Sequence, residues 1–328
     1  MVDLSIILPV YNHAPYIKQA IDSILMQKVN FTYEVLIGED CSTDNSREIL
    51  KNLEKNLPSN FHIFYREKNM GGKGEGNFND LYKRMQGRYI SVLEGDDFWT
   101  YEYKLQKEYD FLEEHLDYIA VAHDTEVVDE NGNKMHWTYP CCRKPEYTIW
   151  DFRKGLLAGQ TATIMARNYI NDPSIDTQLL PSSFPGDRKD AFLLIANGRV
   201  HCFLEKWSAY RLVVTHGSSF SATSRLQPPD FKAPLDYYYS LYDYACKHDV
   251  DEKVKLVTEQ LYFNYLFRIV LRKKISEISF KDLKEAFHNL HHPIRTSVYT
   301  TIQSLLWPYH KINGKLESIK YEKATGLR

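Results

Sequence analysis

The sequence predicts an α/β fold with a largely parallel sheet. Three observations support this prediction: short apolar runs alternate with segments of helical periodicity, turn-forming residues separate the two, and the alternation repeats four times within the first 115 residues. Continuous apolar runs are typical of strands buried on both faces, and repeated strand–helix units produce parallel pairing. Ligands of such sheets bind at the carboxyl ends of the strands.

The first four strands are expected at residues 4–10, 34–38, 61–65 and 89–93. A helical segment follows each of them. Pro15 suits the first turn of the first helix, because proline lacks the N–H that this turn leaves unpaired. Thr43 or Asp44 is a candidate cap for the second helix, which runs to about Lys55. The third helix ends near Met85, and the fourth covers residues 101–115.

The pattern changes after residue 117. Residues 118–129 are extended, and Asn131-Gly132 is a hairpin signal. Further elements are expected as a strand at 161–166, a helix at 187–197 and short strands at 200–204 and 210–214. Helical periodicity then dominates, at 236–247, 252–274, 280–290 and 297–306. We therefore expect a sheet-containing domain over residues 1–225 and a helical C-terminal extension over residues 226–328.

Composition excludes some classes of protein. The 328 residues carry a formal net charge of −2, so the chain lacks the positive excess of a nucleic-acid-coating protein. With 43% hydrophobic and 26% charged residues, it is typical of folded globular chains. The charge is uneven, because residues 226–328 hold 16 basic and 12 acidic groups, which leaves −6 on residues 1–225.

Cysteine usage and the N-terminus bear on the compartment. The five cysteines are odd in number and show no CxxC spacing, which favours free thiols in a reducing cytosol. No apolar run approaches the ~18 residues of a membrane-spanning helix. The apolar N-terminus contains Asp3 and has no basic leader, so we expect a buried first strand there and not a signal peptide. The predicted location is cytoplasmic.

The strongest chemical signal is Glu94-Gly95-Asp96-Asp97, at the end of the fourth apolar run. Carboxylates at the ligand edge of a sheet suit Mg²⁺ or Mn²⁺ bridging a diphosphate, because these cations prefer hard oxygen ligands. Such a cation offsets the charge of the diphosphate and assists its departure as a Lewis acid. The structural alternative is a polar loop that caps the next helix.

Two further polar segments follow the second and third strands. Residues 39–44 form a helix N-cap box in the structural interpretation, whereas in the functional one Asp40 hydrogen-bonds a base or a ribose. Residues 69–77 are rich in glycine, so their backbone can approach a phosphate, with Lys73 adding charge. A flexible structural loop is the alternative. The glycines do not fit the GxGxxG register, which disfavours a dinucleotide-dependent oxidoreductase.

In this order, the segments resemble the family 2 glycosyltransferases with a GT-A fold, over roughly residues 1–220. The matching segments are Pro9-Val10-Tyr11-Asn12, residues 39–44, residues 69–77 and residues 94–99. The resemblance implies a Rossmann-like mixed sheet with helices on both faces, a nucleotide-sugar donor, usually a UDP-sugar, and Mn²⁺ or Mg²⁺ as cofactor. It implies bacterial polysaccharide biosynthesis, with donor binding in residues 1–115 and the acceptor side and catalytic base in residues 116–225.

The donor-binding residues of the family carry over to Pro9, Val10, Tyr11, Asn12, Asp40, Asn69, Lys73, Asn77, Glu94 and Asp96. Asp40 matches the residue that reads the base. Asp96 and Asp97 match the last two carboxylates of the metal and ribose motif, and Glu94 replaces the commoner Asp with the same charge.

Two departures from the family pattern stand out. Cys41 replaces the commoner Gly without an obvious penalty. Glu75-Gly76-Asn77 stands where the family has Ala-Arg-Asn. Lys73 is therefore the candidate substitute for an arginine contact to the diphosphate.

An inverting transfer needs one general base to deprotonate the acceptor hydroxyl. In the family this is an acidic residue that opens a helix in the second half, and residues 185–190 match that element. The spacing to Gly198 favours Asp187 as the base, with Asp190 as the runner-up. The structural alternative is that both carboxylates complement a helix N-terminus.

Two remaining features concern the metal and the partners. Some relatives place a histidine after a similar Tyr-Arg strand, which makes His216 a further candidate metal ligand.

The C-terminal extension gathers aromatic residues, among them Tyr237-Tyr238-Tyr239, and the basic run Arg272-Lys273-Lys274. One interpretation is a surface for a lipid-linked acceptor, with peripheral contact at the inner face of the membrane. Packing against the catalytic domain or a second subunit, as in a homo-oligomer, is favoured.

The predicted function is an inverting, metal-dependent glycosyltransferase that moves a sugar from a nucleotide-sugar to a saccharide hydroxyl. The alternative is a catalytically silent nucleotide-sugar-binding scaffold subunit, which the retained acidic pair and candidate base disfavour. No nucleic-acid partner is expected.

Overall fold

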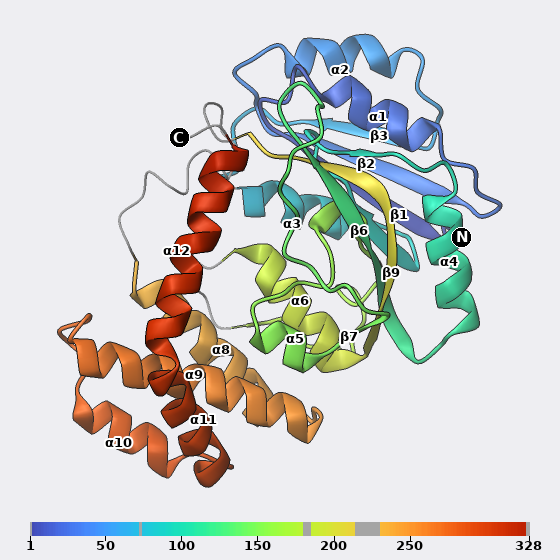
Figure 1. Cartoon of the computed structure of the whole chain (residues 1–328). Helices are drawn as coiled ribbons and strands as arrows, with labels where there is room; N and C mark the ends of the chain where they lie inside the picture. Colours follow the sequence, from blue (N-terminus) through green and yellow to red (C-terminus); the bar gives the residue numbers. More distant parts are fainter. Residues whose placement is uncertain (1, 72–73, 180–184, 214–229, 326–328) are drawn as a thin grey trace. The chain divides into compact units, whose positions relative to one another are not determined.

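The computed structural model describes residues 2–71, 74–179, 185–213 and 230–325 (Figure 1). Contacts within the chain define two compact units. The sheet unit comprises residues 1–147, 156–176 and 198–227, and the helical unit comprises residues 148–155, 177–197 and 228–328. The boundary at residues 225 and 226 that the sequence suggests stays a prediction.

Within the described residues, nine strands form one mixed sheet. They are β1 Leu4–Val10, β2 Tyr33–Glu39, β3 Phe61–Tyr65, β4 Tyr89–Val92, β5 Phe98–Trp99, β6 Tyr118–Val128, β7 Glu146–Tyr147, β8 Met165–Arg167 and β9 Arg199–Arg211. Their order is β3-β2-β1-β4-β8-β6-β9-β5, with β7 beside β9. β1 is parallel to β2 and β4, whereas β8 is antiparallel to β4 and β6. The carboxyl ends of β1, β2 and β4 therefore meet at one edge, where ligands of such sheets bind.

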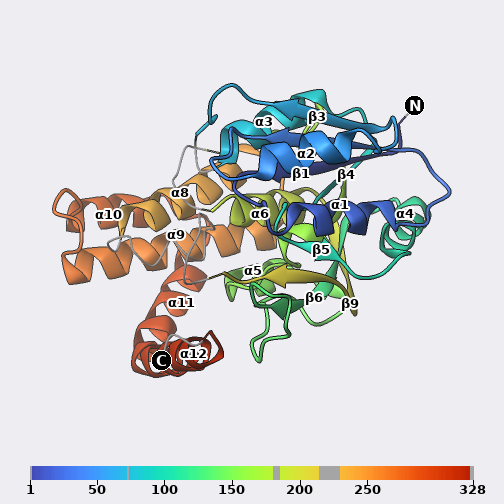
Figure 2. The same ribbon diagram turned by 90° about the horizontal axis from the view of Figure 1, so that it is seen from above.

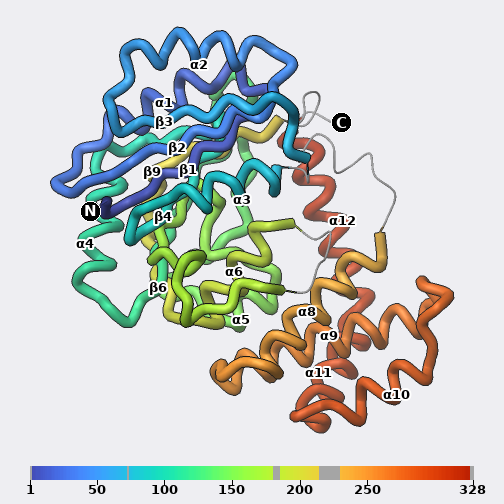
Figure 3. The backbone as a smooth tube through the Cα atoms, turned by 180° about the vertical axis from the view of Figure 1, so that it is seen from behind, coloured from blue at the N-terminus to red at the C-terminus, as the bar shows by residue number. Residues whose placement is uncertain are grey.

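Helices cover both faces of the parallel part of the sheet. Those of the sheet unit are α1 Ile17–Leu25, α2 Ser46–Glu54, α3 Glu75–Arg84 and α4 Lys104–Glu114. α1 and α2 lie on one face and α3 lies on the other, as two opposite views show (Figures 1 and 3). The expected mixed α/β sheet with helices on both faces is confirmed.

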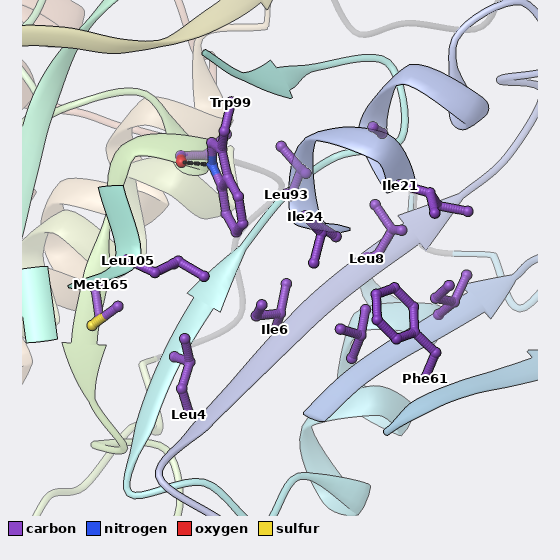
Figure 4. Packing of buried hydrophobic residues seen from close by; sticks show 14 of the residues in the cluster. Leu4, Ile6, Leu8, Ile21, Ile24, Phe61, Leu93, Trp99, Leu105 and Met165 are labelled. Atoms are coloured by element: carbon purple, nitrogen blue, oxygen red, sulfur yellow. Dashed lines mark hydrogen bonds between the residues drawn. The ribbon is translucent and has the colours of Figure 1, made fainter. Parts of the chain in front are cut away.

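The core of the sheet unit explains why the strand segments are continuously apolar. Leu4, Ile6 and Leu8 of β1 pack with Ile21 and Ile24 of α1 in one buried cluster (Figure 4). The intervening Ile7, on the opposite face of the strand, is equally buried. A strand covered on both faces has no solvent-facing positions, so its sequence shows no alternation.

Most elements expected in residues 1–130 are confirmed to within a few residues. The hairpin signal at Asn131-Gly132 is also confirmed, because Gly132 has a φ of 86° and Val128 bridges Lys134.

Two expectations after residue 160 are wrong. The expected strand at 161–166 begins as a 3-10 turn, η2 Thr161–Thr163, and only β8 is extended. The two short strands expected at 200–204 and 210–214 belong to one strand, β9, within the described residues. Glu205 and Lys206 interrupt the apolar pattern, but the backbone pairing with β6 continues through a register shift.

The helical unit contains α5 Ile149–Arg153, α6 Gly186–Asn197, α8 Lys232–Lys247, α9 Glu252–Arg272, α10 Phe280–His288, α11 Pro293–Leu305 and α12 Trp307–Ala324. α8 and α9 lie side by side (Figure 2). The buried carboxylate of Glu259 in α9 accepts the N–H of His291 at 2.6 Å and the hydroxyl of Thr296, which holds the start of α11. The expected C-terminal helical extension is confirmed.

α12 is a helix that the sequence analysis did not foresee. In the sequence, Pro308 interrupts the helical periodicity. In the structure it lies in the first turn of α12, where proline is tolerated. α10 and α12 contain no buried residue. Among the residues that the structure describes, no helix combines the length and the apolar character that crossing a bilayer requires.

Candidate active site

The loops that follow β1 and β2 are tied together by polar side chains. Asn12 has a φ of 58°, a left-handed conformation that asparagine tolerates. Its Oδ1 accepts the N–H of Thr43 at 2.8 Å, and its own N–H donates to Oγ of Ser42 at 3.1 Å. The side chain of Asn12 therefore shapes the loop after β1. Of the other expected binding residues in this segment, Val10 is fully buried in the core, whereas Pro9 and Tyr11 are partly exposed.

Asp40 lies directly after β2, against the segment that follows β3. Its Oδ1 accepts the N–H of Met70 at 2.8 Å, and Nδ2 of Asn69 donates to its backbone carbonyl at 3.1 Å. Burial raises the pKa of Asp40, although the Met70 N–H and the nearby Arg66 oppose this effect. The structure thus brings together Asp40 and Asn69, which the sequence placed in one donor site.

Asn77 faces the sheet. It is 2% exposed, and its Nδ2 donates to the carbonyl of Gly38 at 2.8 Å. Glycine at position 38 lets the side chain of Asn77 come this close, because a Cβ there would lie 2.2 Å from Oδ1 of Asn77. The side chain of Asn77 therefore braces α3 against β2, and its expected contact with the donor stays a prediction.

Arg66, which sequence analysis missed, lies beside Asn77. It forms an ion pair with Asp80 at 2.6 Å, and its Nε is buried with no hydrogen-bond partner among the described residues. Its positive charge acts on Asp40. Lys73, the expected substitute for an arginine, lies outside the described residues.

The acidic cluster after β4 consists of Glu94, Asp96 and Asp97. Asp97 is 2% exposed, and both of its oxygens are held: Oδ1 accepts the backbone N–H of Arg211 at 2.7 Å, and Oδ2 accepts Nε2 of Gln160 at 2.8 Å. Burial, and then the charges of Asp96 and Glu94, hold the pKa of Asp97 well above its ordinary value. Negative charge is therefore concentrated here at a cost in free energy.

Asp96 is the more accessible of the two adjacent aspartates. Its side chain is 19% exposed, and its Oδ1 lies 3.8 Å from Nε2 of His13. The imidazole of His13 packs so closely on Gly95 that a Cβ there would lie 2.5 Å from Nδ1. The loop after β1 and the acidic cluster are therefore in contact, as the sequence prediction of a shared site requires.

The buried guanidinium of Arg211 lies next to the cluster. Its Nε donates to the carbonyl of Asp96 at 2.9 Å, its Nη2 donates to Oε1 of Gln19 at 2.8 Å, and it stacks over the ring of Tyr16. Its N–H groups thus go to neutral acceptors. Three carboxylates beside one guanidinium leave the site with a net negative charge.

This donor set fits a divalent cation that is shared with a diphosphate. Mg²⁺ and similar ions bind through one or two carboxylates and take their remaining ligands from phosphates and water. Within the described part of the chain, no three His, Cys, Asp or Glu side chains converge to hold a metal by themselves. Asp96 and Asp97 are the carboxylates that fit this role. His216, the further candidate ligand, lies outside the described residues.

The candidate base Asp187 lies in the first turn of α6, in the helical unit. Its Oδ1 is buried and has no hydrogen-bond partner among the residues described. Burial raises the pKa of Asp187, while the neighbouring Arg188 opposes this. A raised pKa makes a carboxylate a stronger base. Asp190, the runner-up, is one turn further on in the same helix and is partly exposed.

Sequence reasoning also missed Gln160 and misjudged Cys41. Gln160 lies 63 positions from Asp97, and no local motif marks it. Cys41 has a φ of 58°, which explains why glycine is commoner there. The expectation of no obvious penalty at this position is therefore wrong, since a residue with a Cβ pays roughly 1 kcal/mol for this conformation.

Comparison with known proteins agrees with this geometry. The family model Glycosyl transferase family 2 matches residues 5–172, which is more than half of the chain. The chain therefore belongs to glycosyl transferase family 2. The matched segment includes the loops after β1, β2 and β4 as well as Gln160, and it ends before Asp187 and Arg211.

Two bacterial relatives illustrate the similarity. An uncharacterized protein of Mycobacterium tuberculosis is 30% identical over 179 residues, which are 55% of this chain and 48% of that protein. The putative teichuronic acid biosynthesis glycosyltransferase TuaG of Bacillus subtilis is 38% identical over 111 residues, which are 34% of this chain and 42% of TuaG. The chain thus spans about half the length of these curated relatives.

Among solved structures, S. aureus TarS 1–349 in complex with UDP-GlcNAc superposes with a TM-score of 0.58 at 19% sequence identity. The match covers 82% of this chain and 72% of the TarS chain. At this identity the likeness is one of fold. It confirms the expected GT-A fold class.

Proposed function

We propose that this protein is an inverting glycosyltransferase that moves a sugar from a nucleotide-sugar, a UDP-sugar, to a hydroxyl group of a saccharide acceptor. Membership of glycosyl transferase family 2 supports this. So does TarS, which shares the fold and has been crystallised with UDP and with UDP-GlcNAc. The relative TuaG supports a role in the synthesis of a bacterial polysaccharide or glycoconjugate.

The observation that carries the proposal is the acidic cluster at the end of β4. Burial, and then the charges of Asp96 and Glu94, raise the pKa of Asp97, and a fold gains nothing in stability from placing three carboxylates together in this way. Its use is the binding of a cationic ligand. In our proposal Asp96 and Asp97 hold Mn²⁺ or Mg²⁺, which supplies Lewis-acid assistance to the leaving diphosphate.

The nucleotide is bound at the neighbouring strand ends. Nδ2 of Asn69 donates to the backbone carbonyl of Asp40, and the carboxylate of Asp40 is the acceptor for a base N–H. The Pro9–Asn12 loop contacts the nucleotide, Glu94 lies at the ribose side, and Lys73 and Asn77 act on the diphosphate side.

The chemistry is a single displacement. Asp187 accepts the proton of the acceptor hydroxyl, whose oxygen forms a bond to the anomeric carbon. The bond from that carbon to the diphosphate oxygen breaks, and the electron pair leaves with the diphosphate. One displacement inverts the configuration. The buried, unpartnered Oδ1 of Asp187 supports its role as the base.

Asp187→Asn tests this assignment. We expect the variant to keep the thermal stabilisation by the donor with Mn²⁺, and to lose at least about a hundredfold in transfer rate, because general bases contribute about that much. Asp190→Asn, in the same helix, is the matched control and should keep its rate. Full transfer by Asp187→Asn would place the base elsewhere.

A thermal-shift screen of nucleotide-sugars with Mn²⁺ identifies the donor, since stabilisation grows with ligand concentration over Kd. A chelator should abolish both transfer and the metal-dependent part of the shift. Undiminished transfer in a chelator would remove the metal from the proposal. Donor binding without donor hydrolysis or transfer would favour the scaffold alternative.

We also propose that the C-terminal helices join copies of the chain. The side chains of Ile294, Leu305, Tyr309 and Ile312 are each at least 60% exposed, and apolar exposure on this scale marks contact surfaces. Analytical ultracentrifugation should show a dimer or larger assembly that Leu305→Lys/Ile312→Lys reduces. A monomer that floats with anionic liposomes would instead indicate a peripheral membrane contact with a lipid-linked acceptor.

A further inference from the structure

Gln160 joins two carboxylates of the acidic cluster. Its Nε2 lies 2.8 Å from Oδ2 of Asp97 and 3.3 Å from Oε2 of Glu94. The orientation of the amide group is fixed, because its Oε1 accepts the N–H of Ala162 at 2.7 Å and a flip would lose this hydrogen bond. Gln160 is 3% exposed, so bulk water does not compete for these contacts. Its two amide hydrogens therefore point to the two acids in a fixed geometry.

The side chain of Gln160 is neutral, unlike lysine or arginine, which could also donate hydrogen bonds to a carboxylate from this position. Lysine or arginine at this position would place a positive charge where the proposed cation acts, and glutamate would add another negative charge. The second partner of Asp97, the backbone N–H of Arg211, is neutral as well. The hydrogen bonds of Asp97 thus come from neutral dipoles, and the one guanidinium beside the cluster, that of Arg211, is outnumbered by three carboxylates.

We propose that Gln160 is a positioning residue that sets the affinity of the acidic cluster for a divalent cation. It holds Glu94 and Asp97 at a fixed separation and adds no charge of its own, so the cluster is assembled before the cation arrives and keeps its net negative charge. The inference rests on the proposed function, which places the cation at this cluster.

Three substitutions separate the charge of this side chain from its hydrogen bonds. Gln160→Glu keeps an acceptor for the Ala162 N–H, removes both donors and adds a negative charge. Gln160→Met removes the hydrogen bonds without adding charge. Gln160→Lys brings a cation into the cluster. Gln106→Met is the matched control, because Gln106 also donates to a carboxylate, that of Asp110 at 2.7 Å, on the exposed face of α4.

The measurement is the Kd for Mn²⁺, by electron paramagnetic resonance on the full chain, first for Mn²⁺ alone and then with saturating UDP, which supplies the diphosphate ligands. One charge added or removed within a few ångströms should change this Kd by about tenfold or more at the effective dielectric of a protein. We expect about tenfold tighter binding for Gln160→Glu, about tenfold weaker binding for Gln160→Lys, weaker binding by about threefold for Gln160→Met, and no change for Gln106→Met.

A merely structural role would weaken binding in all three variants, so opposite shifts for the Glu and Lys variants are the decisive result. If Gln160→Lys does not fold, as judged by circular dichroism, tighter binding by Gln160→Glu than by Gln160→Met is the required outcome. Equal Kd values in the wild type, Gln160→Glu and Gln160→Met overturn the inference alone. A wild type that binds UDP but binds no Mn²⁺ even in the presence of UDP overturns the metal assignment of the proposed function, and the inference with it.

Discussion

The sheet unit buries two clusters of charged side chains that are built in opposite ways. At the end of β4, Asp97 is held by N–H groups that carry no charge and lies next to further acids. Between α4 and β6, Lys104 lies 2.9 Å from Glu108, and neither side chain has any exposed surface. His123 is 3.8 Å from the other oxygen of Glu108.

The difference lies in where each carboxylate finds its counter-charge. A buried charge is costly unless it is paired. Glu108 has an ammonium group of the same helix one turn away, so its counter-charge lies within the protein. The guanidinium of Arg211 lies next to Asp97 and lowers its pKa, but this one cation is outnumbered by three carboxylates, so the cluster keeps a net negative charge. We infer that the first cluster supports the fold and that the second is built for a ligand.

Removing the charge at the end of β4 should give the largest effect on function. For Asp97→Asn we expect donor turnover to fall at least about a hundredfold, since several kcal/mol of stabilisation depend on a cation at this site. The free energy of unfolding should change by less than about 1 kcal/mol, because one hydrogen bond is lost but a neutral group is easier to bury. Initial rates with Mn²⁺ and urea melts measure the two quantities. Asp117→Asn breaks an exposed ion pair with Arg199, so it should leave the rate unchanged and lower the free energy of unfolding by at most about 1 kcal/mol.

The second cluster should respond in the opposite sense. Lys104→Met leaves Glu108 buried without its cation, so the free energy of unfolding at about pH 8 should fall by about 3–5 kcal/mol. The Kd for Mn²⁺ should stay as in the wild type. The double variant Lys104→Met/Glu108→Leu should recover most of the loss, because a well-packed apolar pair replaces a buried ion pair at little cost. Unchanged stability of Lys104→Met would show that the ion pair is not what supports this region.

The pH dependence of stability should expose His123. Burial holds the pKa of His123 well below its ordinary value of 6.5. When the pH falls below 6.5, His123 therefore binds a proton in the unfolded chain but stays neutral in the folded chain. Stability from this group is present above pH 6.5 and is lost as the pH falls. Burial raises the pKa of Glu108 from 4.5 to about 7, so its contribution is present below pH 4.5 and is lost as the pH rises through 7. Between pH 4.5 and 6.5, the contributions of His123 and Glu108 therefore change the free energy of unfolding in opposite directions.

His123→Gln removes the contribution of His123 to the pH dependence of stability. Relative to the wild type, its free energy of unfolding should rise by up to about 2 kcal/mol as the pH falls from 6.5 to about 5, at about 1.4 kcal/mol for each pH unit. Chemical denaturation over this pH range measures the difference. His201→Gln is the control, since His201 is only partly buried and should give a smaller change. Parallel pH profiles of His123→Gln and the wild type would contradict the prediction.

The smallest expected effect concerns the backbone near the donor site. Cys41→Gly relieves a left-handed conformation and should raise the free energy of unfolding by about 0.5–1 kcal/mol, after the greater flexibility of glycine in the unfolded chain is allowed for. Cys41→Ala keeps the conformational cost and removes the thiol, so it should not stabilise. Equal stabilities of the Gly and Ala variants would assign any change to the thiol.

Local sequence signals were sufficient for the scaffold of the site. The apolar runs located β1 to β4 closely, and Asp40, Asp96 and Asp97 stand at strand ends because they directly follow those runs. Asn77 shows the limit of the method. Its position in the motif predicted a donor contact, which stays a prediction, but no local signal showed that its Nδ2 donates to the carbonyl of Gly38, because the packing of α3 on β2 decides that contact.

The sequence by itself therefore determined the α/β class, the order of the strand-end motifs and the residue types that meet at the acidic edge, because these depend on neighbours in the chain. The tertiary structure alone decided which distant residues complete them. Gln160 and Arg211 reach Asp97 from 63 and 114 positions away. Lys104 and Glu108, at a spacing typical of a solvated helix pair, are fully buried because β6 covers that face of α4.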